Sequence, residues 1–138
     1  MKLILDREVL DKYNQYYFTQ HPKAHVEPIP HPHHPSINTW FIMKRPEMNA
    51  LKQKWKDFIV WWVKDLDLPQ MNKVRITFSV YFPTKRRRDV DNQVPKFILD
   101  GFVEAGLIPD DDGEHLTALT LKVGYDKEHP RTEILIEE

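Results

Sequence analysis

The sequence predicts one α/β (α+β) domain in which a mixed β-sheet is covered by two main helices. Residues 73–82 alternate apolar and polar side chains, the pattern of a half-buried strand. Residues 47–66 repeat apolar side chains at intervals of three and four, which defines one face of a helix. Residues 116–136 contain two further strand-like stretches. A chain of 138 residues, 41% of them hydrophobic, can bury a core of its own, so we expect residues 1–138 to form a single domain.

The first third of the chain has the least regular pattern. Leu3 to Leu5 predict a short strand, and apolar residues at helical spacing from Asp6 onward predict a helix after it. Residues 21–35 hold five prolines and five of the seven histidines. This proline density forbids a helix and favours extended, turn-rich backbone, in which residues 24–29 could still form an edge strand. Residues 38–44 alternate enough to predict another strand.

Proline and glycine mark the ends of the two main helices. Pro46 predicts the start of the helix over 47–66. A second helix is expected to start near Val94–Pro95 and to end at Ala105, where Gly106 predicts a left-handed cap. Five residues join the strands expected at 116–125 and 131–136, so we expect these strands to pair as a hairpin.

Composition excludes several classes of protein. The formal net charge is −1, so the chain lacks the overall basic excess of a protein that coats DNA. There is no cysteine, which excludes disulfides, thiol catalysis and cysteine-rich zinc sites. No apolar run approaches the roughly 18–20 residues of a membrane span, and the N-terminal residues lack the apolar core of a signal peptide. We therefore expect a cytoplasmic protein without a membrane partner.

Charged residues of both signs gather between residues 85 and 112. Four cations precede two aspartates at alternate positions, a lysine follows at the expected helix start, and three aspartates follow the helix: Lys85, Arg86, Arg87, Arg88, Asp89, Asp91, Lys96, Asp110, Asp111 and Asp112. On extended backbone, alternate side chains project to one face, so Asp89 and Asp91 can point at one metal ion. Carboxylates beside cations suit Mg²⁺ and a phosphodiester, because Mg²⁺ prefers hard oxygen ligands and substrate phosphates. We interpret Asp112 and Glu114 as solvated turn residues.

Other metal and phosphate motifs are weaker or absent. A zinc site is conceivable at the histidines of the proline-rich segment, but zinc sites usually pair histidine with cysteine or use fixed helical spacing, so we favour solvated loop histidines; they are His21, His25, His31, His33 and His34. The acidic loop lacks the residue order of a helix–loop–helix calcium site. The sequence contains no P-loop, no G-x-G-x-x-G and no G-x-S-x-G.

These charged residues resemble the signature of the RusA family of Holliday-junction resolvases, metal-dependent endonucleases that are often prophage-encoded. The family pattern is R-R-D-x-D-N, a lysine, a helix with an internal aspartate, then A-G and a pair of aspartates. In this chain the pattern falls on residues 86–92, Lys96, Asp100 and residues 105–111. Pro35-Ser36-Ile37-Asn38 resembles the family's P-S-x-N stretch. The resemblance covers about residues 24–137 and leaves residues 1–22 as an N-terminal extension.

The resemblance implies a function and a role for each matched residue. It implies a Mg²⁺- or Mn²⁺-dependent endodeoxyribonuclease that resolves four-way junctions in branched DNA by paired phosphodiester hydrolysis. The implied metal-binding catalytic carboxylates are Asp89, Asp91 and Asp111, with Asp110 as a helper. Lys96 would be the cation near the scissile phosphate, and the flanking DNA phosphates would be held by Lys85, Arg86, Arg87 and Arg88. Two symmetric nicks favour a two-fold homodimer.

Two departures from the family pattern and two other function classes stay open. Lys96 follows Asp91 by five residues rather than four, and the third aspartate of the acidic loop would let the last ligand shift to Asp112. The alternatives are a non-catalytic DNA-binding or phage-assembly module on the same scaffold, and a metal-dependent phosphohydrolase with a smaller substrate. For the dimer, Leu99 and Val103 are hypothetical face residues, because they are apolar but lie off the expected buried face of their helix.

Overall fold

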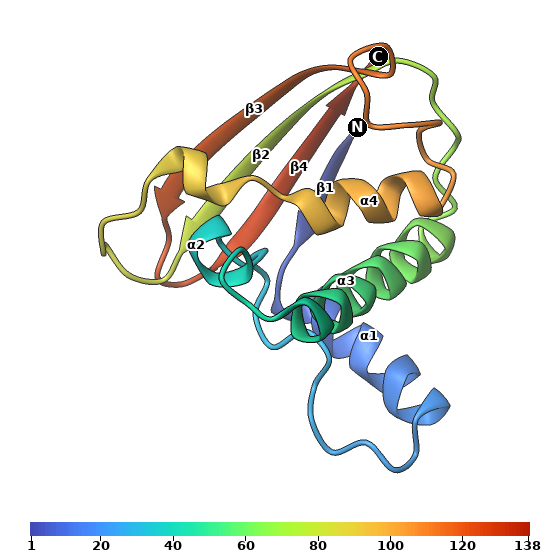
Figure 1. Cartoon of the computed structure of the whole chain (residues 1–138), viewed down its shortest axis with the longest axis vertical. Helices are drawn as coiled ribbons and strands as arrows, with labels where there is room; N and C mark the ends of the chain where they lie inside the picture. Colours follow the sequence, from blue (N-terminus) through green and yellow to red (C-terminus); the bar gives the residue numbers. More distant parts are fainter.

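The computed structural model describes residues 1–138 as a mixed four-stranded sheet with helices packed against it (Figure 1). The elements in chain order are β1 Lys2–Leu5, α1 Arg7–Gln20, α2 Ile37–Trp40, α3 Arg45–Asp65, β2 Val74–Phe82, the 3₁₀ helix η1 Val90–Gln93, α4 Lys96–Glu104, β3 Leu116–Tyr125 and β4 Arg131–Glu137. The expected α/β class, with one mixed sheet and two main helices, is confirmed. No helix combines the length and the apolar character that a bilayer crossing requires.

The strand order is β1-β4-β2-β3, so the predicted hairpin of the last two strands is wrong. β2 lies between β3, its parallel neighbour, and β4, its antiparallel neighbour. Adjacent strands lie about 4.8 Å apart, so the link from β3 to β4 has to span about 10 Å, which five residues can do. This link, Asp126–Pro130, passes the end of β2, where the Asp126 N–H donates to the Phe82 carbonyl at 2.9 Å.

The central place of β2 follows from its composition. Val74, Ile76, Phe78 and Val80 are all buried on the side that faces the helices. The connection from β2 to β3 runs through α4, the kind of crossover that parallel strands need. β3 is an edge strand with no fully buried residue, so it is the least protected part of the sheet.

The N-terminal strand and helix are part of the core. Leu3 and Leu5 are buried where β1 pairs with β4, which confirms the strand expected there. Asp6 caps α1, because its carboxylate accepts from the Val9 N–H at 3.1 Å. Leu10 is fully buried in the same hydrophobic cluster as α3 and α4. The first twenty residues are therefore integral to the fold, although the resemblance leaves them without a counterpart.

The main helices start and end close to the predicted positions. Pro46 lies in the first turn of α3, and Gly106 ends α4 with a φ of 75°. Leu99 on α4 is only 5% exposed and belongs to the core. The dimer-face hypothesis is therefore wrong for Leu99, because a residue buried within one chain cannot contact a second copy. Val103 is partly buried and packs against the same core.

The strand predicted over 38–44 is wrong, because these residues form α2 and the turn after it. The Ser36 carbonyl accepts from the Thr39 and Trp40 N–H groups, so the backbone is satisfied locally without a partner strand. Phe41 and Ile42 remain 74% and 81% exposed. The edge strand considered over 24–29 is also absent; this segment is irregular.

α3 and α4 approach most closely at Gly101. A Cβ built on Gly101 would lie 2.6 Å from the Cβ of Ile59, a residue that is fully buried in α3. The position of a Cβ atom is fixed by the backbone, so rotating the Ile59 side chain cannot relieve this clash. Only glycine therefore fits where the two helices cross.

Gly101→Ala should lower the free energy of unfolding by about 1–3 kcal/mol, because overpacking at Ile59 outweighs alanine's better helix propensity. Urea denaturation measures the change. Gly113→Ala is the matched control, since a Cβ there meets nothing within 4 Å. A Gly101→Ala variant as stable as the parent would contradict the close approach of the two helices.

Candidate functional site

The first turn of α4 brings Lys96 against two carboxylates. The Lys96 ammonium donates to Asp100 Oδ1 at 2.9 Å and lies 3.6 Å from Asp111 Oδ2. Asp111 comes from the loop after α4, and its ion pair with Lys96 places that loop beside the start of the helix. The fold thus joins two of the residues that the family pattern assigns to one site.

Asp100 lies between two lysines and is largely buried. Its side chain is 15% exposed, and Lys52 from α3 approaches its Oδ2 at 3.6 Å. This oxygen is enclosed and makes no hydrogen bond within the chain. The hydrogen bond that Lys96 donates to Asp100 raises the pKa of Lys96, with a smaller contribution from Asp111, so Lys96 stays protonated at neutral pH. Sequence reasoning missed Lys52, which carries no motif; only helix packing brings it here.

Asp89 and Asp91 lie before α4 on a different kind of backbone from the one predicted. Asp89 is extended, but Asp91 is inside η1, so the alternation argument for their shared direction is wrong. Both side chains are exposed, and Asp89 Oδ1 lies 3.5 Å from the Arg87 guanidinium. The 3₁₀ turn and the Val94–Pro95 step take up the extra residue between Asp91 and Lys96.

The carboxylate set suits Mg²⁺ in its chemistry, while the arrangement does not close a three-carboxylate cage. No three of Asp89, Asp91, Asp110 and Asp111 have oxygens within 4.8 Å of one another. Carboxylates repel one another, and the fold places Asp111 against Lys96 and Asp89 against Arg87 instead. Asp110 turns its Oδ1 to the Asp111 N–H at 2.8 Å.

One other group, Asp112, Glu114 and His115, has ligand atoms within 4.8 Å of each other. Asp112 accepts from the backbone N–H groups of Glu114 and His115, both at 3.1 Å, as a turn residue does. Asp112 and Glu114 are exposed, as expected of turn residues. This geometry explains their proximity without a bound ion.

The four consecutive cations have different surroundings. Arg88 lies over the Phe82 ring at 3.9 Å and donates to the Thr84 and Arg86 carbonyls at 3.0 Å, so its guanidinium is used to shape the loop. Lys85 lies 5.1 Å from the Tyr125 ring centroid. Arg87 forms an ion pair with Asp89. The Arg86 side chain forms no ion pair, hydrogen bond or cation–π contact within the chain. Arg86 is therefore the cation most available to a ligand.

Two of the segment's histidines are structural, which corrects the prediction of solvated loop histidines for His33 and His34. His34 is 7% exposed; its Nδ1 donates to the Pro35 carbonyl at 2.7 Å and its Nε2 accepts from the Phe97 N–H at 3.0 Å. Burial lowers the pKa of His34 to about 4, so the imidazole is neutral. His33 Nε2 donates to the Tyr81 carbonyl at 2.9 Å. The remaining three are exposed, as predicted: His21, His25 and His31.

The two motif stretches of the family pattern are in contact. The Asn38 N–H, in the P-S-x-N stretch, donates to Asn92 Oδ1 at 3.0 Å. His34, just before that stretch, fixes the first turn of α4 through Phe97. The segment from residue 34 to residue 38 therefore holds both η1 and α4 in position beside Lys96.

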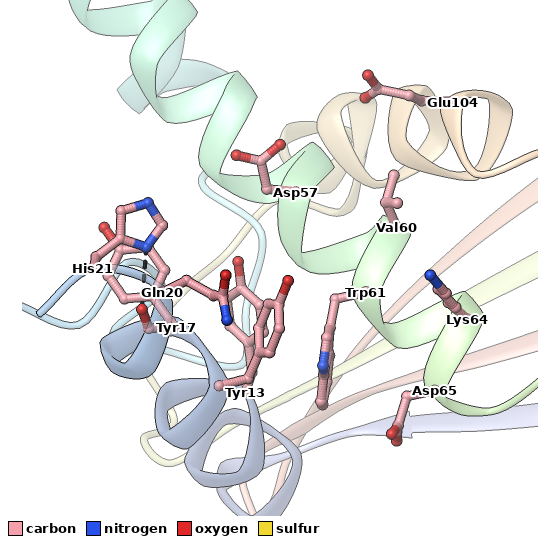
Figure 2. A pocket seen from close by; sticks show the side chains of 11 residues that line it. Tyr13, Tyr17, Gln20, His21, Asp57, Val60, Trp61, Lys64, Asp65 and Glu104 are labelled. Atoms are coloured by element: carbon pink, nitrogen blue, oxygen red, sulfur yellow. Dashed lines mark hydrogen bonds between the residues drawn. The ribbon is translucent and has the colours of Figure 1, made fainter.

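A hollow of about 750 Å³ lies elsewhere, between α1 and α3 (Figure 2). Its floor is aromatic, with the Tyr13 and Trp61 ring centroids 5.1 Å apart. Two carboxylates at its rim are paired, Asp65 with Lys12 at 2.8 Å and Glu104 with Lys56 at 3.3 Å. Trp61 is half-buried here. This hollow shares no residue with the candidate site.

The neutral His34 imidazole makes stability depend on pH. Its pKa in the folded chain, about 4, lies below the ordinary value of 6.5, so the unfolded chain binds a proton first as pH falls. The contribution is complete above pH 6.5 and is lost as pH falls toward 4, by up to about 1.4 kcal/mol per pH unit and about 3 kcal/mol in total.

His34→Gln removes this titration, so its unfolding free energy should fall less steeply than that of the parent between pH 6.5 and 4. Urea denaturation across this range measures both slopes. His21→Gln, at an exposed histidine, is the control and should keep the parent slope. Identical slopes for His34→Gln and the parent would contradict a neutral buried imidazole.

No protein-family model matches the chain, and no curated protein sequence matches it. The arrangement of Lys96, Asp100, Asp111 and the neighbouring arginines is therefore the basis for a functional assignment.

Proposed function

We propose that the chain is a metal-dependent endodeoxyribonuclease that acts on branched DNA and resolves four-way junctions. One observation carries the proposal: the Lys96 ammonium lies 3.6 Å from Asp111 Oδ2, although the two residues are separated by a helix and a loop. The contact between Asn38 and Asn92 supports it further, because it joins the other two stretches of the same pattern.

The chemistry follows from the charges near Lys96. Mg²⁺ or Mn²⁺ held by Asp89, Asp91 and Asp111, with Asp110 beside them, would supply an activated water and neutralise phosphate charge. Lys96 has its pKa raised by Asp100, so it acts as a fixed cation and not as a general base. A cation in this place stabilises the negative charge that develops on the phosphate oxygens during hydrolysis.

The basic segment gives the chain its hold on DNA. Arg86 is free to bind backbone phosphates, Arg87 can exchange its contact with Asp89 for a phosphate, and Lys85 is exposed beside Tyr125. Arg88 instead keeps the segment in shape through Thr84 and Phe82. Two cuts at a symmetric junction require two such sites, which a two-fold homodimer supplies.

One observation favours a second candidate, a non-catalytic DNA-binding or phage-assembly module. Asp89 and Asp91 are exposed and do not form a compact three-carboxylate group with Asp111. A module of this kind would keep the arginines and the scaffold while lacking hydrolysis. The two candidates differ in a single measurable property, the metal-dependent cleavage of DNA.

Asp91→Asn and Asp111→Asn should each reduce Mg²⁺-dependent nicking of a synthetic four-way junction by at least about 100-fold, because a lost carboxylate weakens the metal site. Binding of the junction in the absence of metal should be retained. Asp112→Asn is the control and should cleave like the parent. A parent protein that binds the junction but never cleaves it, with Mg²⁺ or Mn²⁺, would favour the non-catalytic module.

Arg86→Gln and Arg88→Gln should separate DNA contact from loop structure. Arg86→Gln should weaken junction binding and lower the slope of log K against log salt by about 0.7–0.9, with little effect on thermal stability. Arg88→Gln should lower the unfolding midpoint by roughly 2–4 °C, because it loses its bonds to Thr84 and its contact with Phe82. If Arg86→Gln lowered the unfolding midpoint and Arg88→Gln weakened junction binding instead, the roles of DNA contact and loop structure would be assigned wrongly.

A further inference from the structure

A polar hollow of about 480 Å³ lies beside the basic segment, between α2 and η1. The residues that matter for its chemistry are Asn38, Thr39, Arg86, Arg87, Asn92 and Gln93. Its volume is within the roughly 300–1,000 Å³ of small-ligand pockets, and it is much larger than a single phosphate group needs. The hollow therefore has room for a phosphate together with a larger attached group.

The charge of the hollow favours an anion. Three guanidinium groups line it against one carboxylate, Asp89, which already lies 3.5 Å from Arg87. Arg88 is committed to the loop, so Arg86 and Arg87 are the two that can turn to a ligand. Guanidinium groups bind phosphate through paired hydrogen bonds, which suits this part of the hollow to a phosphate.

Gln93 adds an amide that is available to a ligand. Its side chain is only 7% exposed and lines the hollow, yet its amide makes no hydrogen bond within the chain. No atom of this amide is among the fully enclosed, unpaired polar atoms of the chain, so water reaches it from the hollow and a ligand can replace that water. The Asn92 amide also faces the hollow, with its Oδ1 already bound to the Asn38 N–H.

Amide side chains suit the edge of a nucleobase, because each carries a donor and an acceptor side by side. A base stacked on an aromatic ring is a weaker alternative here. Apart from the His34 imidazole, Phe82 is the only aromatic side chain that lines the hollow. Its ring is already packed against the His33 ring, with centroids 4.6 Å apart, and against the Arg88 guanidinium, 3.9 Å from the Phe82 centroid. Hydrogen bonds to a base edge therefore suit this hollow better than stacking does.

We propose that this hollow binds one unstacked nucleotide of the DNA substrate, with its phosphate on Arg86 and Arg87 and its base edge on Gln93 and Asn92. The inference rests on the proposed action on branched DNA, where bases at the branch point cost least to unstack. It deepens that proposal, because it names the part of the substrate that the protein reads directly.

The test is the binding of small probes to the full chain without divalent metal. Titrations followed by amide NMR shifts compare the four deoxynucleoside monophosphates with inorganic phosphate and with the deoxynucleosides. At least one monophosphate should bind about fivefold or more tightly than both inorganic phosphate and its own nucleoside, since it alone satisfies both halves of the hollow. Equal affinity for monophosphate and inorganic phosphate, or no saturable binding of any monophosphate, overturns the proposal.

Two variants locate the site. Gln93→Met keeps the side-chain volume and should reduce monophosphate affinity to that of inorganic phosphate, while Arg86→Gln should weaken both by roughly fivefold. Matched controls outside the hollow, Gln70→Ala and Arg75→Gln, should bind like the parent. Thermal melts identify any variant with a lowered melting point, and Asn38→Ala then serves as the second test, because its backbone bond to Asn92 is kept. Unchanged monophosphate binding in Gln93→Met also overturns the proposal.

The junction-cleavage assay keeps this inference separate from the proposed function. Metal-dependent junction cleavage without selective monophosphate binding would overturn the nucleotide pocket alone. Selective monophosphate binding without cleavage would overturn the nuclease assignment and leave a nucleotide-reading DNA-binding module.

Discussion

The structure depends on one neutral imidazole that joins two distant parts of the chain. His34 donates to the Pro35 carbonyl and accepts from the Phe97 N–H, so it occupies the place of a side-chain cap at the start of α4. α4 has no other side-chain cap, because Pro95 stands at its N-cap position. The direction in which Lys96 leaves the helix, and with it the contact to Asp111, therefore depends on a histidine sixty-two residues earlier in the chain.

The candidate site pairs three of its carboxylates, Asp89, Asp100 and Asp111, with cations. Lys96 is shared by Asp100 and Asp111, and Lys52 approaches the far oxygen of Asp100. Enclosing a carboxylate is costly, and the attraction of the second lysine offsets part of that cost for Asp100. The hydrogen bond to Asp100 in turn raises the pKa of Lys96 and so keeps Lys96 protonated. A helix–helix contact and a loop thus fix the charge of one side chain.

Local patterns predicted much of the fold, and long-range pairing was beyond them. β2, α3 and α4 were predictable from periodicity, and the left-handed Gly106 from its position after a helix. The partner of each strand was not, because alternation identifies a strand without naming its neighbour. A helix between the stretches at 73–82 and 116–125 was a signal of parallel pairing, and that signal was overlooked in favour of the short link after β3.

The candidate site was predictable only in part, because local patterns again do not specify long-range packing. Lys96 and Asp111 were identified from residue types and spacing, and the fold brings them together. Asp91 was assigned to extended backbone, but local hydrogen bonding closes a 3₁₀ turn there. His34 was interpreted as solvated because burial depends on the packing of α3 and α4, which no pattern in the histidine-rich segment records.

The position of β4 has a consequence for the order in which the protein can assemble during synthesis. β4 is inserted between β1 and β2, and β1 has no other neighbour in the sheet. β1 must therefore remain unpaired until β4 has been translated. Until then the nascent chain exposes unpaired backbone N–H and C=O groups along β1 and along one side of β2, which favour association with other strands.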